Sequence, residues 1–192
     1  MTIVILAAGA SQRMGKQKLL LPIEGRAIIG RVLDAAAAWP CVVVTSDEVA
    51  SMLGPTVLRI VRNDAPERGM SHSLDLGNSV VDEQEPIAVL LGDLPDITPA
   101  AIAGIISAYD ATFDIVVPRC GNTFVHPVVF GPAARRKIAA LPDGDTIKRL
   151  RDDPTLRRLV VATTSGCLTD IDTPSDYRAR IGRHGGAAEP SQ

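Results

Sequence analysis

The chain contains 192 residues, of which 46% are hydrophobic and 3% aromatic, and it carries a formal net charge of −2. This length and composition fit one ordinary domain with an ample core. The small charge and the scarcity of aromatic rings argue against a nucleic-acid-binding protein, and no apolar stretch has membrane-spanning length. No basic segment precedes the first apolar run, so we expect no signal peptide.

The three cysteines, Cys41, Cys120 and Cys167, lie far apart in the sequence. Their spacing gives neither a disulfide framework nor a CxxC metal motif. We therefore expect small core thiols in a reducing compartment, and a cytoplasmic protein without a membrane or nucleic-acid partner.

In the first part of the chain, strands and helices alternate. Apolar runs rich in β-branched residues predict strands at residues 2–8, 41–46, 56–63 and 86–93. Segments with apolar residues on one face, or with capping signals, predict helices at residues 27–39, 48–54, 71–83 and 98–110. Thr98 is the expected N-cap of the last of these helices, with Pro99 at its first position.

The second part continues the alternation less regularly. Further strands are predicted at residues 113–118, 126–130, 156–163 and 167–172, and helices at 131–141 and 174–182. Alternation of this kind indicates an α/β fold, a Rossmann-like three-layer sandwich around a mostly parallel sheet. We expect a single domain of residues 1–183, with a small, polar, disordered tail at 184–192. Ligands in such folds bind at the carboxyl ends of the strands.

The first strand ends in small residues that are followed by positive charge. Ala7, Ala8 and Gly9 would let the backbone approach a bulky ligand closely, and Arg13 and Lys18 add charge suited to phosphates. The spacing fits neither the dinucleotide fingerprint nor the P-loop. From the residues alone, a nucleotide-binding loop and a tight turn with a solvated basic rim are equally supported.

Carboxylates follow two other predicted strands. Asp93 ends the strand at 86–93, and Asp170 and Asp172 lie two residues apart near the end of the strand at 167–172. Carboxylates at this edge of a sheet are suitable ligands for Mg²⁺, but aspartates also commonly cap helices. We expect Asp96 to support the loop or helix that follows it.

The stretch "LAAGASQRMGKQKLLLP" resembles the signature of the sugar-nucleotide-transferase-like nucleotidyltransferases, and more narrowly that of the molybdenum cofactor cytidylyltransferases. The matching residues are Leu6, Ala7, Ala8, Gly9, Arg13, Met14, Gly15, Lys18 and Pro22. The segments "NDAPERGMSHSLDLG", "LLGDLPDITPA", "HPVVF" and "DIDTPSDY" extend the resemblance over nearly the whole chain. Guanylyltransferases of this superfamily usually carry a second glycine where this chain has Ala8, which favours cytidine.

The resemblance implies a Mg²⁺-dependent transfer of CMP from CTP to the phosphate of the molybdenum-pterin cofactor, with release of pyrophosphate. Because a phosphate monoester is already ionised, the reaction needs positioning and charge neutralisation rather than a protein nucleophile. The implied catalytic residues are Arg13, Lys18 and Asp93, and the implied metal ligands are Asp93 and Asp172. The implied nucleotide-binding residues are Leu6, Ala7, Ala8, Gly9, Arg13, Lys18, Gly69, Ser73 and Asp93.

The acceptor side of the resemblance departs from the family pattern. His126, Lys148 and Arg149 are the candidate acceptor ligands, although a structural histidine and an exposed helix face are equally supported. Val125 replaces a frequent glycine, and "GDTIKRL" replaces a G-D-x-G-A-R-like stretch. Two alternatives remain open. One is a cytidylyltransferase for another small phosphate, such as a sugar, polyol or isoprenoid-precursor phosphate. The other is a non-catalytic carrier that delivers the finished cofactor to a molybdenum hydroxylase.

Overall fold

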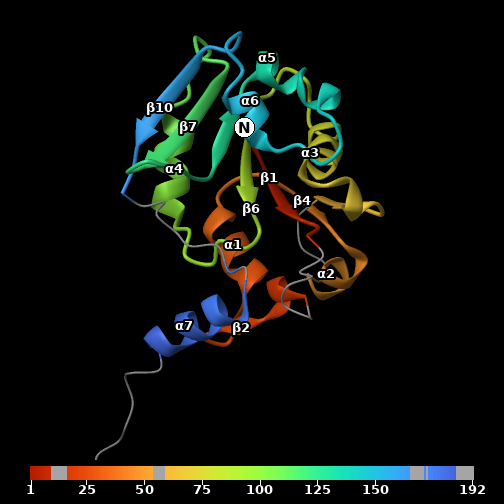
Figure 1. Cartoon of the computed structure of the whole chain (residues 1–192), viewed down its shortest axis with the longest axis vertical. Helices are drawn as coiled ribbons and strands as arrows, with labels where there is room; N and C mark the ends of the chain where they lie inside the picture. Colours follow the sequence, from red (N-terminus) through yellow and green to blue (C-terminus); the bar gives the residue numbers. More distant parts are fainter. Residues whose placement is uncertain (10–16, 54–58, 165–170, 172, 185–192) are drawn as a thin grey trace, which may run out of the picture.

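The computed structural model describes residues 1–9, 17–53, 59–164, 171 and 173–184 (Figure 1). The centre of its main sheet is a set of parallel strands in the order β6–β1–β4–β5. Their bounds are β1 (Thr2–Ala7), β4 (Cys41–Thr45), β5 (Arg59–Arg62) and β6 (Ile87–Leu91). β1 and β4 are buried along their whole length because helices cover both faces, which explains their uninterrupted apolar sequences.

The other half of the sheet contains a reversed strand. Beyond β6 the order is β9–β7–β10, with β8 paired to β7. The bounds are β7 (Ile115–Cys120), β8 (Thr123–Phe124), β9 (Val128–Phe130) and β10 (Arg158–Ala162). β9 runs antiparallel to both β6 and β7, whereas β10 is parallel to β7. As a consequence, the residues just before β9 lie beside the residues that follow β6.

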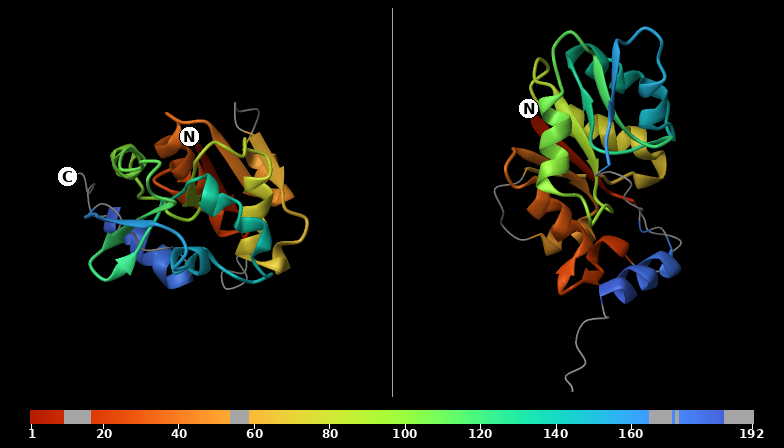
Figure 2. Two further views of the ribbon diagram at one scale, coloured as in Figure 1. Left: turned by 90° about the horizontal axis from the view of Figure 1, so that it is seen from above. Right: turned by 90° about the vertical axis from the view of Figure 1, so that its left-hand side faces the viewer.

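Helices pack on both faces of the sheet, which gives the expected three layers (Figures 1 and 2). One face carries α1 (Ile28–Ala36), α2 (Asp47–Met52) and α4 (Pro99–Ser107), and the other carries α3 (Met70–Asn78), α5 (Pro132–Arg135) and α6 (Ile147–Arg151). Alternate residues of β1 serve the two sides: Ile3 and Ile5 belong to the first core cluster, and Val4 belongs to the second. Thr98 caps α4 as predicted, accepting a bond from the Ala101 amide at 3.2 Å.

A small unit at one end of the molecule holds the last helix. The short helix η2 (Lys18–Leu20) leads into a two-stranded hairpin, β2 (Pro22–Ile23) and β3 (Arg26–Ala27), and α7 (Pro174–His184) lies beside it (Figure 1). The Tyr177 hydroxyl donates to the Pro22 carbonyl at 2.6 Å, and Arg180 pairs with Asp96. Asp96 therefore supports its loop through α7. None of the described helices is both long and apolar enough to cross a bilayer.

The helices differ most from the sequence prediction at α3, at residues 131–141 and at α6, which was not among the predicted helices. α3 ends at Asn78, five residues before the predicted end at 83, and the predicted helix at 131–141 divides into α5 and the short helix η4 (Ile138–Ala140). The reason for the first difference is Arg135, which is 3% exposed and binds the chain beyond α3. Its guanidinium donates to the carbonyl oxygens of Asn78 and Val81 at 3.0 Å and to those of Asp82 and Glu85.

The structure also differs from one prediction about the cysteines and from one about the end of the last helix. Cys41 is a free buried thiol as expected, but Cys120, at the end of β7, is disulfide-bonded. His184 belongs to α7 rather than to the predicted tail. Cys167 and residues 185–192 lie outside the described residues.

Candidate active site

The carboxyl end of β1 is fixed by its two neighbouring strands. Thr45 Oγ1 donates to the Ala7 carbonyl at 3.0 Å, and the Gly92 amide donates to the Leu6 carbonyl at 2.9 Å. Leu6, Ala7 and Ala8 are buried, whereas Gly9 is exposed. A Cβ at Gly92 would lie 3.0 Å from the Ala7 side chain, so a glycine there lets the turn after β6 pack against β1. Of the four predicted nucleotide-contacting residues here, only Gly9 reaches the surface. Arg13 lies outside the described residues.

Lys18 and Asp93 meet at this edge of the sheet, although 75 residues separate them in sequence. Lys18 Nζ lies 2.7 Å from Asp93 Oδ2, and the two side chains are 13% and 18% exposed. Lys18 is presented by η2, whose N-cap Gln17 accepts a bond from the Leu19 amide at 3.4 Å. The structure therefore brings together one residue predicted to bind the triphosphate and one predicted to bind metal.

The second oxygen of Asp93 fits a divalent cation. Asp93 Oδ1 is buried and has no hydrogen-bond partner in the described part of the chain. A desolvated carboxylate oxygen without a donor is costly unless a cation or donor joins it, and Mg²⁺ prefers carboxylate oxygens. Within the described ranges no group of three or more His, Cys, Asp or Glu side chains could hold a metal ion. Asp172, the other predicted ligand, lies outside these ranges. The N-cap position of α7 is taken by Thr173, whose hydroxyl accepts from the Asp176 amide at 3.2 Å.

His126 lies near Asp93 because β9 is reversed. Its Nδ1 is 3.1 Å from the Val89 carbonyl oxygen of β6. A carbonyl only accepts, so Nδ1 carries the proton and Nε2 of the neutral ring is an acceptor. Burial lowers the pKa of His126 below its ordinary value, while the Val89 carbonyl and the Asp93 carboxylate act in the opposite direction. The ring is therefore neutral at neutral pH.

Ser73 and Gly69 both have roles in the fold. Ser73 Oγ accepts a bond from Asn63 Nδ2 at 2.9 Å, and Asn63 Oδ1 accepts from the Ala65 amide at 2.9 Å. Asn63 is 4% exposed, and the sequence analysis did not single it out, although it begins the "NDAPERGM" segment. Gly69, at the start of α3, has φ +87° and ψ −167°. Their predicted contact with nucleotide stays a prediction.

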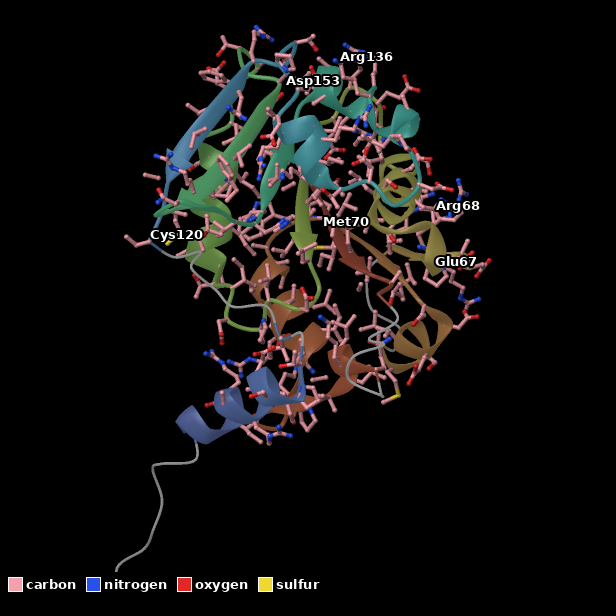
Figure 3. The ribbon with its side chains drawn as sticks, in the orientation of Figure 1. Glu67, Arg68, Met70, Cys120, Arg136 and Asp153 are labelled. Atoms are coloured by element: carbon pink, nitrogen blue, oxygen red, sulfur yellow. The ribbon has the colours of Figure 1, made fainter. Side chains whose placement is uncertain are left out.

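The segment before α6 is bonded to the segment before α3. The Gly144 amide donates to the Arg68 carbonyl at 2.7 Å, and the Ser71 amide donates to the Asp145 carbonyl at 3.2 Å. Arg68 Nε also pairs with Asp143 Oδ2 at 2.9 Å, on the outer edge of the molecule where Figure 3 labels Arg68. The part of the chain predicted to bind nucleotide is thus connected directly to the part predicted to bind the acceptor.

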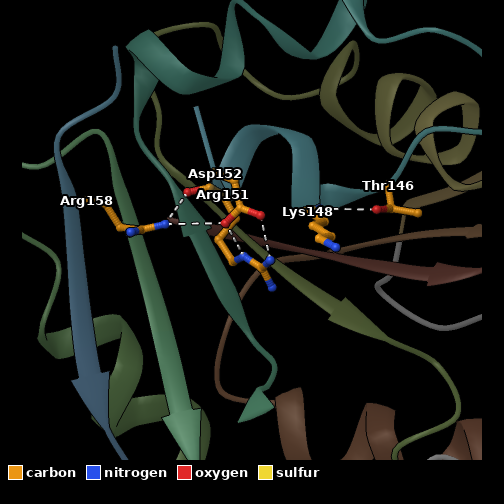
Figure 4. A network of polar contacts seen from close by, with 5 residues as sticks. All are labelled: Thr146, Lys148, Arg151, Asp152 and Arg158. Carbon is orange, nitrogen blue, oxygen red and sulfur yellow. Dashed lines mark hydrogen bonds and ion pairs between the residues drawn. The ribbon is translucent and has the colours of Figure 1, made fainter. Parts of the chain in front are cut away.

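On α6, the two predicted acceptor ligands are exposed. Arg149 Nη1 is 3.2 Å from Asp145 Oδ2, a pair four residues apart, and the Lys148 side chain extends away from Arg151 and Asp152 (Figure 4). Exposure and this ion pair are compatible with both alternatives for Arg149, so its role as an acceptor ligand stays a prediction. Lys148 as an acceptor ligand likewise stays a prediction.

A third basic residue of α6, Arg151, was missed by the sequence analysis. Its guanidinium lies 4.3 Å from the centre of the Phe124 ring in β8, two residues before His126. Asp152 holds the guanidinium with two bonds of 2.8 and 2.7 Å (Figure 4). One clue to this contact was present in the sequence: Phe124 is an aromatic residue two positions before His126.

Comparison with known proteins establishes the class to which this fold and site belong. Residues 3–160 match the MobA-like NTP transferase domain family. The chain therefore belongs to the MobA-like NTP transferases, a family of nucleotidyltransferases, and the predicted family and α/β fold are confirmed.

Three relatives illustrate the similarity. Purine catabolism protein PucB of Bacillus subtilis (strain 168) is 30% identical over 91% of this chain and 92% of its own length. The crystal structure of an Rv0371c homologue from Mycobacterium sp. strain JC1 superposes with a TM-score of 0.84 and is 28% identical, covering 95% of each chain. Rv0371c from Mycobacterium tuberculosis H37Rv, solved in complex with manganese, gives a TM-score of 0.76 and 25% identity over 94% of this chain and 97% of that chain.

Proposed function

We propose that this protein is a metal-dependent nucleotidyltransferase that transfers CMP from CTP to the phosphate of the molybdenum-pterin cofactor and releases pyrophosphate. The observation that carries the proposal is the Lys18–Asp93 pair, with a 2.7 Å contact and with Asp93 Oδ1 buried and unpartnered in the described residues. A lysine and a carboxylate at the carboxyl edge of this sheet suit a triphosphate and its divalent cation. We assign the reaction to one domain, residues 1–183, acting in the cytoplasm.

In the proposed reaction, an oxygen of the acceptor phosphate attacks the α-phosphorus of CTP. The new P–O bond forms as the bond to the β-phosphate breaks, and pyrophosphate leaves. Arg13 and Lys18 would bind the triphosphate and offset the charge that collects on pyrophosphate. Asp93 and Asp172 would hold the metal, for which we propose Mg²⁺, and its charge would stabilise the phosphate oxygens. The manganese bound by Rv0371c supports a divalent cation in this fold.

His126 supports an acceptor that carries hydrogen-bond donors. With Nδ1 committed to the Val89 carbonyl, the neutral ring offers only the lone pair of Nε2. That lone pair would bind an N–H or O–H group of the acceptor rather than its phosphate. A pterin ring supplies such N–H groups.

One alternative acceptor is favoured by a specific observation. Arg149, a predicted acceptor ligand, is paired with Asp145, and the segment around it departs from the family pattern. A smaller phosphate, such as a sugar, polyol or isoprenoid-precursor phosphate, would need fewer contacts there. A carrier that passes finished cofactor to a molybdenum hydroxylase is less well supported, because carrying needs no metal-binding carboxylate.

The decisive experiment measures pyrophosphate release from CTP, GTP, ATP and UTP with Mg²⁺ or Mn²⁺. Each nucleotide is tested without an acceptor, with molybdenum-pterin cofactor, and with a sugar, polyol or isoprenoid-precursor phosphate. We expect release from CTP only when the cofactor is present. Asp93→Asn should abolish it, whereas Asp153→Asn should not, because Asp153 also pairs with a lysine at 2.7 Å but belongs to the Lys137 contact. Release with a different phosphate alone would establish the alternative acceptor, and no release under any condition would overturn the enzymatic function.

A further inference from the structure

The Lys18–Asp93 contact sets two proposed roles against each other. A carboxylate oxygen that accepts from an ammonium at 2.7 Å has no room for a metal ion on the same side. A metal ion on the other oxygen, Oδ1, would bind the same carboxylate as the lysine ammonium, and the two positive charges would repel each other. Lys18 and a divalent cation therefore compete for Asp93.

The surroundings of the pair make this competition strong. Both side chains are mostly shielded from water, with 13% and 18% exposure, so solvent screens the ammonium charge poorly. Both backbones are also held in place. Lys18 is followed by the buried Leu19, and Asp93 follows Gly92, whose amide is bonded to the end of β1. The four-carbon stem of Lys18 is the adaptable part of the contact.

We propose that the Lys18 ammonium on Asp93 Oδ2 weakens the binding of a divalent cation at this carboxylate until a triphosphate draws the ammonium away, so that the cation binds tightly only together with nucleotide. This inference rests on the proposed function, because it assumes that Asp93 holds the metal. A triphosphate offers more negative charge than one carboxylate, and moving the lysine onto it frees Asp93 Oδ2. Lys18 thus controls when the metal binds at Asp93, in addition to binding phosphate.

The test measures Mn²⁺ binding without any nucleotide, by the electron paramagnetic resonance signal of free Mn²⁺. We expect Lys18→Met to bind Mn²⁺ roughly tenfold more tightly than the wild type, since a competing unit charge is removed from a shielded site. Lys137→Met is the matched control, because Lys137 Nζ also lies 2.7 Å from an aspartate oxygen but in a distant pair. It should leave Mn²⁺ affinity unchanged. Lys18→Gln and circular dichroism guard against a folding defect in the methionine variant.

Three outcomes would overturn the proposal. They are an unchanged or weaker Mn²⁺ affinity in folded Lys18→Met or Lys18→Gln, no detectable binding to any of the proteins, and a gain that persists when Asp93→Asn is added. The last result would put the ion elsewhere. A failure of the proposed function is seen separately, as a lack of pyrophosphate release from the wild type, and the Mn²⁺ measurement does not depend on that activity.

Discussion

Replacing Gly69 with alanine should damage both the fold and the nucleotide side of the site. Gly69 has φ +87° and ψ −167°, a backbone conformation that is essentially restricted to glycine. A Cβ at this position would lie 2.8 Å from Gly144 Cα and 3.1 Å from Gly144 N. Both contacts are with backbone, so no side chain can swing aside to relieve them.

The expected cost has two parts. Backbone strain at a conformation of this kind costs about 1–3 kcal/mol. Pushing Gly144 away also weakens the 2.7 Å bond from its amide to the Arg68 carbonyl, a contribution of about 1 kcal/mol. Together these lower the free energy of unfolding by about 2–4 kcal/mol, which in a domain of this size lowers Tm by roughly 10 °C.

Urea unfolding followed by the fluorescence of Trp39, the single tryptophan, measures this loss directly. Gly104→Ala is the matched control, because Gly104 lies in α4 and a Cβ there has no neighbour within 4 Å. In an open helical position alanine should stabilise the protein by up to about 1 kcal/mol. If Gly69→Ala is as stable as the wild type, the reasoning from its conformation and from the Gly144 contact is wrong.

Three further predictions concern buried polar groups. Arg135→Met should lower the free energy of unfolding by about 3–5 kcal/mol, because four backbone carbonyls, one buried and three part-buried, lose their donor. In a urea titration the exposed neighbour Arg136→Met should change it by less than about 0.5 kcal/mol. The pKa of His126 is lower in the folded than in the unfolded protein. The contribution of the neutral ring to the free energy of unfolding should therefore be fully present above about pH 6.5 and be lost as pH falls below it. His126→Gln should lose that part of the pH dependence, and an unchanged profile would contradict the assignment. Burial raises the pKa of Cys41 to about 11, so its alkylation at pH 8 should be slow in buffer and fast in urea; equal rates would be inconsistent with a buried thiol.

The central strands could be predicted because burial on both faces leaves an unambiguous pattern. β1 and β4 are uninterrupted apolar runs, and the structure places them within a residue of the predicted bounds. The direction of β9 could not be predicted, since "HPVVF" has the same pattern whichever way it runs. Its antiparallel pairing involves not only β7, which shortly precedes it, but also β6, which is distant in sequence.

Long-range partners also explain the other differences. The predicted helix from 71 to 83 runs past Gly77 and Asn78, residue types that favour the end of a helix. Arg135, 57 residues later, binds the carbonyl oxygen of Asn78. Arg151 escaped notice because α6 is only five residues long and has too few turns to show a periodic face. Sequence motifs did identify Lys18 and Asp93, but their mutual contact is a property of the fold.

The connection between Gly69 and Gly144 gives the two halves of the proposed site a shared framework. Arg68, just before α3, and Ser71, in its first turn, form backbone hydrogen bonds with the segment before α6. A nucleotide that orders the start of α3 would therefore also order the segment before α6, on which the predicted acceptor ligand Lys148 depends. Binding energy from one substrate would then reduce the cost of positioning the other. Acceptors should for this reason be compared with nucleotide bound, because a screen without nucleotide would measure an acceptor site that lacks this support.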